Sequence, residues 1–172
     1  MSYWLMKTEP SSFSVEDLER EPSKTTAWDG VRNYQARNML RDQMKCGDQA
    51  FLYYSNCDEP GIVAIVEIVE EGYPDPTAFE RKHHHYDPKS DPAKPRWFLV
   101  DVQLKRRLRR IVTLKELRHY ASKELRGMMI LRQGNRLSVT PVSAAHWKFI
   151  RSLSDRAKRG KRTELRMPPD GR

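Results

Sequence analysis

The sequence predicts an α+β fold that is mainly β: a small β-barrel or rolled sheet with short helices at its periphery. The chain of 172 residues is long enough for one domain that buries its core without disulfide bonds. Short runs rich in β-branched and aromatic residues alternate with short helical patterns, which favours a sheet. Long helical patterns between the strands are missing, so a doubly wound parallel sheet is not expected.

The expected strands are short apolar runs between turn signals. In the run at residues 97–104, Phe98, Val100 and Val102 alternate with other residues, which predicts a half-buried strand. Pro141 places the last strand at a sheet edge or at a bulge. The expected strands cover residues 3–7, 49–55, 62–69, 97–104 and 136–142, and residues 25–28 can be extended.

The expected helices begin after residues whose side chains can cap a helix N-terminus. These candidate caps are Ser14, Asn33, Asp75, Thr113 and Ser143. Ser14 is followed three residues later by Asp17, which is a capping-box pattern. The helices that follow are expected at residues 15–20, 34–43 and 114–118, with a single turn after Asp75 and a final helix after Ser143.

Residues 70–96 contain five prolines, so a regular element through them is not expected. A connection of this length within a compact domain is usually functional or mobile. It contains His83, His84 and His85, a run that invites interpretation as a metal site. Adjacent side chains of an extended loop point in alternating directions, so we expect solvated histidines and no metal site.

The positive charge of the chain is unevenly distributed. The formal net charge is +9, and residues 151–172, with eight Lys or Arg and three Asp or Glu, carry +5 of it. We therefore expect a folded domain over residues 1–150 and a flexible basic arm without a core of its own over residues 151–172. A second basic cluster covers residues 105–110. Such clusters favour an anionic partner, most commonly nucleic acid, although a merely soluble charged surface would look the same.

Targeting and membrane signals are weak. The N-terminus has no basic region followed by an apolar stretch, and the longest apolar runs are too short to span a bilayer. Cys46 and Cys57 form no CxxC pair and no disulfide framework. These features predict an intracellular protein without a membrane partner, nuclear in a eukaryote and otherwise cytoplasmic.

The segment at residues 28–38 combines groups that suit a nucleotide. Trp28 offers a flat face for stacking a base, and the Asn33 amide offers donors and an acceptor that match a base edge. Arg32 and Arg37 can neutralise phosphates. The alternative is that Trp28 and Tyr34 are core residues, Asn33 is only a helix cap and the arginines are surface residues.

Two further polar groups lie near strand ends. Ser55 and Asn56 follow the strand at 49–55 and can face a pocket mouth, although such a pair is also an ordinary turn. Arg136 and Ser138 share one side of the last expected strand, where they can equally be the polar face of an edge strand.

Catalytic motifs are missing from the sequence. It has no GxSxG, no phosphate-binding glycine loop and no HExxH, so no cofactor is expected. Asp29, Asp101 or one of the histidines could serve as a general base. Nothing couples these groups into a triad or a metal site, which disfavours an enzyme.

Six segments in sequence order resemble the EVE domain family. They are YWLMKTEP, WDGVRNYQARNMLRDQMKCGD, FLYYSNC with PGIVAIVEIV, EGYPDPTAF, YDPKSDPAKPRWFLVDV and RLSVTPV. The resemblance implies a PUA-like fold, a rolled β-barrel with peripheral helices similar to the YTH and ASCH families. It also implies a non-enzymatic reader of modified bases in DNA or RNA. The pocket positions it implies are Trp28, Asn33, Tyr34, Ser55, Asn56 and Ser138, with Trp4, Lys7, Trp97 and Arg136 nearby.

The sequence and the resemblance together predict a module that binds DNA or RNA and accepts a flipped or single-stranded nucleobase, including a modified one. Stacking on Trp28 or Trp97 would contribute about 1–3 kcal/mol per base. The nucleic-acid backbone would lie on Lys7, Arg32, Arg37, Arg136 and the cluster at 105–110. Two alternatives remain: a hydrolase or other enzyme acting on a modified nucleobase or RNA, and a protein-interaction module whose basic arm is a targeting signal.

Overall fold

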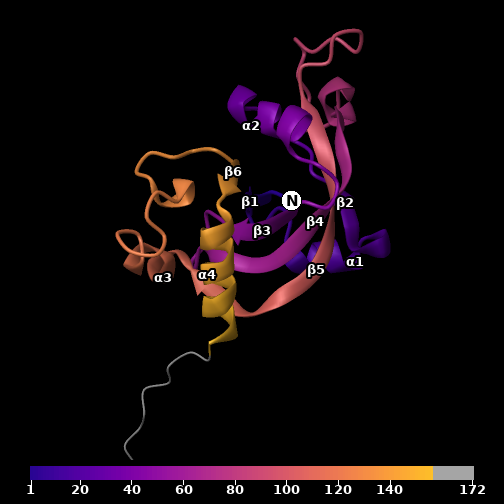
Figure 1. Cartoon of the computed structure of the whole chain (residues 1–172). Helices are drawn as coiled ribbons and strands as arrows, with labels where there is room; N and C mark the ends of the chain where they lie inside the picture. The colour runs from indigo at the N-terminus through magenta and orange to yellow at the C-terminus, as the bar shows by residue number, and fades with distance from the viewer. Residues whose placement is uncertain (157–172) are drawn as a thin grey trace, which may run out of the picture.

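The computed structural model describes residues 1–156, which form one six-stranded sheet with short helices on both of its faces (Figure 1). The strands are β1 (Tyr3–Thr8), β2 (Thr25–Ala27), β3 (Gln49–Tyr54), β4 (Gly61–Pro74), β5 (Phe98–Thr113) and β6 (Val139–Val142). The α-helices are α1 (Val15–Arg20), α2 (Tyr34–Asn38), α3 (Leu114–His119) and α4 (Ala144–Asp155).

The sheet is mixed and open. Its strand order is β2-β5-β4-β3-β1-β6, with β1 and β3 parallel and the other neighbours antiparallel. The expected fold class, mainly β with short peripheral helices, is confirmed. The barrel does not close, because β2 and β6 remain as the two edges, and Pro141 lies on the edge strand β6 as expected.

Both faces of the sheet are buried, which explains why β1 is apolar at every central position. Successive side chains of a strand point to opposite faces. Trp4 and Met6 therefore join the cluster covered by α1 and α2, whereas Leu5 joins the cluster covered by α3 and α4. In the second cluster the Trp147 indole of α4 stacks on the Phe51 ring at 3.9 Å between centroids.

The helix starts follow the predicted caps. Ser14 and Asp17 form a complete capping box, and the side chains of Asn33, Thr113 and Ser143 each accept a hydrogen bond from a backbone N–H of the first turn. Asp75 caps the short 3-10 helix η3 (Pro76–Phe79) in the same way. The helix expected at 34–43 divides into α2 and a π-helical turn, η2 (Met39–Gln43).

Two strands are longer than the sequence patterns indicate. β4 continues to Pro74 and β5 to Thr113, because each supplies the other with a partner along most of its length. Register shifts interrupt this pairing at four places, and such bulges bend a strand pair. The expectation that no regular element enters residues 70–96 was wrong for residues 70–74. The last strand, expected from residue 136, begins only at Val139.

Helix α4 ends the described part of the chain. It runs to Asp155, and Leu153 is buried in the core. The boundary expected at residue 150 thus lies inside this helix, and the predicted basic arm lies, from residue 157 on, outside the described residues. Across residues 1–156 there is no helix with the length and apolar character needed to cross a membrane.

Candidate functional site

Two cavities open beside the C-terminal end of β1, and Lys7 lines both. The first, of about 630 Å³, has Phe13 and Trp28 in its wall and is called the aromatic cavity here. The second, of about 500 Å³, is bordered by Arg118 and Arg132 and is called the basic cavity. Of the predicted pocket residues, Trp28 lies at the aromatic cavity, whereas Ser55 and Asn56 lie at the basic cavity.

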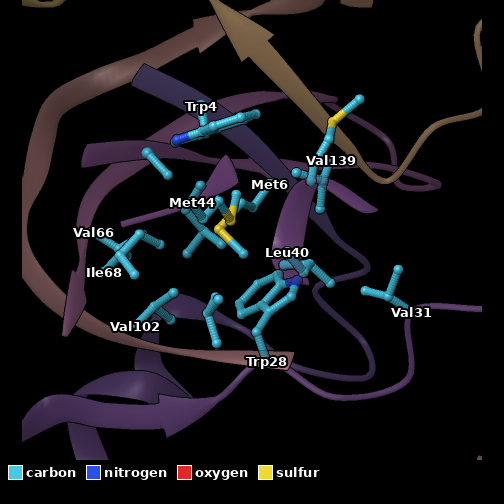
Figure 2. Close-up of a cluster of buried hydrophobic side chains, with 14 of the residues drawn as sticks. Trp4, Met6, Trp28, Val31, Leu40, Met44, Val66, Ile68, Val102 and Val139 are labelled. Atoms are coloured by element: carbon cyan, nitrogen blue, oxygen red, sulfur yellow. The ribbon is translucent and has the colours of Figure 1, made fainter. Parts of the chain in front are cut away.

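Trp28 is both a core residue and part of the cavity wall. Figure 2 shows its indole pointing into the cluster that also contains Leu40 and Val102, and only 8% of the residue is exposed. The Phe13 ring meets it edge-on, at 6.4 Å between centroids and 89° between planes. The sequence offered Trp28 either as a stacking surface for a base or as a core residue, and its position is compatible with both.

The loop at residues 28–33 is held in place by Asp75, which is fully buried. The carboxylate accepts hydrogen bonds from the Gly30 amide (3.0 Å), the Arg32 guanidinium (2.9 Å) and both the amide and the hydroxyl of Thr77. Burial by itself would raise the pKa of Asp75, but these hydrogen bonds outweigh it and hold the pKa below its usual value. The sequence identified Asp75 only as a helix cap.

A close contact of His85 with Gly30 fixes the same loop from the cavity side. Gly30 has a positive φ of 79°, and a Cβ atom at this position would lie 2.3–2.7 Å from the His85 ring. The His85 carbonyl accepts a hydrogen bond from the Arg32 guanidinium at 2.7 Å. The loop at 28–33 therefore packs against residues 75–85 without room for a larger side chain at residue 30.

Gly30→Ala is expected to lower the free energy of unfolding by about 1–3 kcal/mol, because it adds backbone strain and displaces the His85 ring. Urea denaturation followed by circular dichroism measures the change. Gly134→Ala is the matched control, since Gly134 has a similar φ of 77° but open space around the added Cβ. Equal losses in the two variants would contradict a role for the His85 contact.

The structure corrects the expectation for the histidine run. Residues 80–86 form consecutive reverse turns instead of an extended loop, with hydrogen bonds from the His83 amide to Glu80 and from the Tyr86 amide to His83. One ligand atom from each of the three imidazoles lies within 4.8 Å of the others. His84 and His85 line the aromatic cavity, so they are cavity residues that the sequence interpretation missed.

His85 faces Asp29 across the wall of the aromatic cavity. Its Nδ1 atom lies 3.8 Å from the Asp29 carboxylate. Burial lowers the pKa of His85, and the charge of Asp29 only partly opposes this. A lowered pKa favours the neutral imidazole at neutral pH. The acidic residues that line the cavity are Glu9 and Asp29.

Four other predicted site residues form a stack beside α2. The Tyr34 ring lies on the Trp97 ring at 5.0 Å between centroids and 26° between planes. The guanidinium of Arg37 lies over Tyr34, and that of Arg32 lies over Trp97. Trp97 is only 7% exposed, and its indole N–H donates to Asp87 at 2.7 Å. This stack joins α2 to the segment before β5, and none of its members lines either cavity.

At one end of the sheet, β1 and β3 end and β6 begins. Lys7, Ser55 and Ser138 lie next to one another there. The Lys7 amide donates to the Ser138 carbonyl at 2.9 Å, and the Ser55 amide donates to the Thr8 carbonyl at 3.0 Å. Asn56 follows in the left-handed region, with φ of 51°, which asparagine tolerates better than most residues. Within residues 1–156 the Lys7 ammonium has no carboxylate within 4.0 Å, and partial burial lowers its pKa.

The remaining predicted residues differ in how free their side chains are. The Asn33 side chain accepts from the Ala36 amide at 3.0 Å, as a helix cap does. Arg32 donates to Asp75, Thr77 and two backbone carbonyls, and Arg37 donates to the Arg96 carbonyl at 2.8 Å. Arg136 is exposed. Sequence reasoning missed several residues around the aromatic cavity, because they come from distant segments: Thr8, Glu9, Ser12, Phe13, Thr26, His84 and His85.

Comparison with known proteins identifies the family. The EVE domain model matches residues 2–153. Thymocyte nuclear protein 1 of Homo sapiens is 47% identical over 169 residues, covering 90% of this chain and 75% of that protein. The crystal structure of human THYN1 protein in complex with 5-methylcytosine-containing DNA superposes with a TM-score of 0.87 at 44% identity, covering 92% of this chain and 100% of that one. A Pseudomonas syringae protein superposes with a TM-score of 0.83 at 42% identity, over 89% of this chain and 99% of that one. The chain therefore belongs to the EVE domain family.

Proposed function

We propose that this chain binds DNA without catalysing a reaction and accepts one flipped or single-stranded base in the aromatic cavity, with a preference for 5-methylcytosine. The observation that carries the proposal is the cavity at Trp28, in a chain 44% identical to a protein crystallised with 5-methylcytosine-containing DNA. RNA is the second ligand to test, because none of the described lining residues of the cavity is specific for deoxyribose.

The lining of the aromatic cavity supports this role for a cytosine base. Removing a base from its stack costs a few kcal/mol, and stacking on an aromatic side chain returns about 1–3 kcal/mol. The carboxylates of Glu9 and Asp29 can accept from the amino group of cytosine, which thymine lacks. A niche for the added methyl group would contribute about 1–3 kcal/mol of discrimination.

The other predicted residues receive distinct roles in this proposal. Lys7, at the border of both cavities, would contact the phosphate next to the inserted base, and Ser55, Asn56 and Ser138 would approach the same nucleotide from the neighbouring strands. Arg32, Tyr34 and Trp97 would act indirectly, by holding the loop at 28–33. Asn33 would orient the start of α2, and Arg37 and Arg136 would contact the backbone.

Filling the aromatic cavity tests the proposal. Ala27 is exposed on β2 and lines the cavity, so Ala27→Trp is expected to abolish the preference for 5-methylcytosine without disturbing the core. Fluorescence anisotropy with matched single-stranded and duplex oligonucleotides, carrying cytosine, 5-methylcytosine or thymine, measures the affinity. RNA versions of the same sequences form the second arm.

Ala93→Trp is the matched control, because Ala93 is also exposed but lies outside the cavity lining. This variant is expected to keep the base preference of the wild-type protein. Equal affinity of the wild-type protein for all three bases would overturn the proposal. Loss of preference in both variants would show that the aromatic cavity does not determine the preference.

The enzymatic alternative has one observation in its favour, namely the approach of His85 to Asp29 in the cavity wall. It requires turnover of a modified nucleoside or oligonucleotide that Asp29→Asn abolishes. Chromatography of the reaction mixture decides between binding and hydrolysis, since our proposal expects unchanged nucleic acid.

We also propose a nuclear location if the source is a eukaryote, because several relatives are named as nuclear proteins. Microscopy of a fluorescent fusion tests this. A second fusion that ends at residue 156 tests whether the basic arm is a targeting signal, while keeping the buried Leu153 of α4 in place.

A further inference from the structure

The basic cluster at residues 105–110 is largely neutralised within the fold. It lies on β5, where Leu108 is buried in the core, Lys105, Arg107 and Arg109 are exposed, and Arg106 and Arg110 are partly buried. Lys105 pairs with Glu67, and Arg107 pairs with Glu16 and Glu19 on α1. Arg110 forms two hydrogen bonds with Glu116 at 2.6 and 2.7 Å. Three of its five cations therefore already face a carboxylate, which weakens their attraction for a phosphate.

A different segment carries cations that have no such partner. From α3 to the residues before β6, the segment at 115–136 contains six exposed basic residues without a carboxylate within 4.0 Å among residues 1–156. They are Lys115, Arg118, Lys123, Arg126, Arg132 and Arg136. The two acidic residues of the segment are Glu116, which pairs with Arg110, and Glu124. This segment borders the basic cavity.

The basic cavity has the composition of an anion site. Lys7, Arg118 and Arg132 line it, together with the polar side chains of Asn56 and Gln133. No Asp or Glu is among its described lining residues, whereas Glu9 and Asp29 line the aromatic cavity. The two carboxylates disfavour a phosphodiester in the aromatic cavity, the three cations favour it in the basic cavity, and a neutral base can enter the former. Lys7 joins the two sites.

We infer that residues 115–136 and the basic cavity form the track for the DNA backbone, with Lys7, Arg118 and Arg132 around the phosphate next to the inserted base. This inference rests on the proposed function and names the surface that supplies its affinity. Exposed, unpaired cations release counterions from the nucleic acid when they bind phosphates. The ion-paired residues of β5 lie outside the track, although they form the most conspicuous basic run in the sequence.

Two double variants with the same change of net charge test the track. Arg118→Gln/Arg132→Gln removes two cations of the track, and both residues are exposed, so little loss of stability is expected. Lys105→Gln/Arg107→Gln removes two cations of the β5 cluster. Anisotropy titrations with 5-methylcytosine and cytosine oligonucleotides, at several salt concentrations, give the affinity, its salt dependence and the base preference. Circular dichroism confirms that each variant is folded.

The track variant is expected to bind both oligonucleotides about 10- to 100-fold more weakly, with the slope of log affinity against log salt reduced by about 2. Its preference for 5-methylcytosine should remain. The β5 variant should change affinity by less than about threefold. Equal weakening of both variants, or weakening of the β5 variant alone, overturns the track while the proposed function stands. If the wild-type protein shows no base preference, the proposed function is overturned instead.

Discussion

Asp75→Ala is expected to lower the free energy of unfolding by about 3–5 kcal/mol, the range for removing one partner of a buried ion pair. The carboxylate is fully buried and binds Gly30, Arg32 and Thr77. Without it, the Arg32 guanidinium loses its counter-charge, and the Gly30 amide loses its acceptor. The loop at 28–33 should then loosen, so base preference should fall as well. Urea denaturation and oligonucleotide binding measure the two effects.

Asp42→Ala provides the control for this variant. Asp42 also pairs with an arginine, Arg41, at 2.8 Å, but its side chain is 52% exposed. An exposed pair contributes at most about 1 kcal/mol, so this variant should keep nearly all of its stability and its binding. A similar loss in both variants would show that the burial of Asp75 carries no special weight.

The pH dependence of stability provides a second readout for Asp75. Its pKa in the folded protein lies below the usual 3.8, so the unfolded chain binds a proton more readily. The stabilisation from this carboxylate is therefore present above pH about 3.8 and is lost as the pH falls toward the folded pKa. Asp75→Ala should lack this part of the acid-induced loss of stability, which denaturation curves between pH 5 and 2 would reveal.

Trp28→Ala is expected to remove the preference for a modified base and to lower the free energy of unfolding by about 3–5 kcal/mol. The indole packs into the core, and the same residue forms part of the wall of the aromatic cavity. The variant therefore loses both packing and the surface available for stacking. Anisotropy titrations at a temperature where the variant remains folded separate the two losses.

Trp147→Ala is the matched control for this second effect. Trp147 is also buried, at 3% exposure, but it stacks on Phe51 in the cluster on the opposite face of the sheet. It should cost a similar amount of stability and leave base preference unchanged. Loss of preference in both variants would attribute the effect to instability and would contradict the role of Trp28.

Local patterns were sufficient for most of the secondary structure. The caps at Ser14, Asn33 and Thr113 depend on side chains that accept from amides three residues away, so the sequence reveals them directly. The lengths of β4 and β5 depend on pairing between residues 24 or more positions apart, which a local window does not contain. The same applies to the break of the expected helix at Met39, where η2 begins.

The sequence by itself determined the mainly β class, the helix starts and the importance of the segment around Trp28, because composition and short-range spacing carry that information. Only the tertiary structure decided how the charges are used. It pairs Arg107 with Glu16 and Glu19, and buries Asp75 against Arg32, whereas Arg118 is left unpaired among residues 1–156. Electrostatic interaction depends on distance in space and on burial, and neither can be read from the order of residues in the chain.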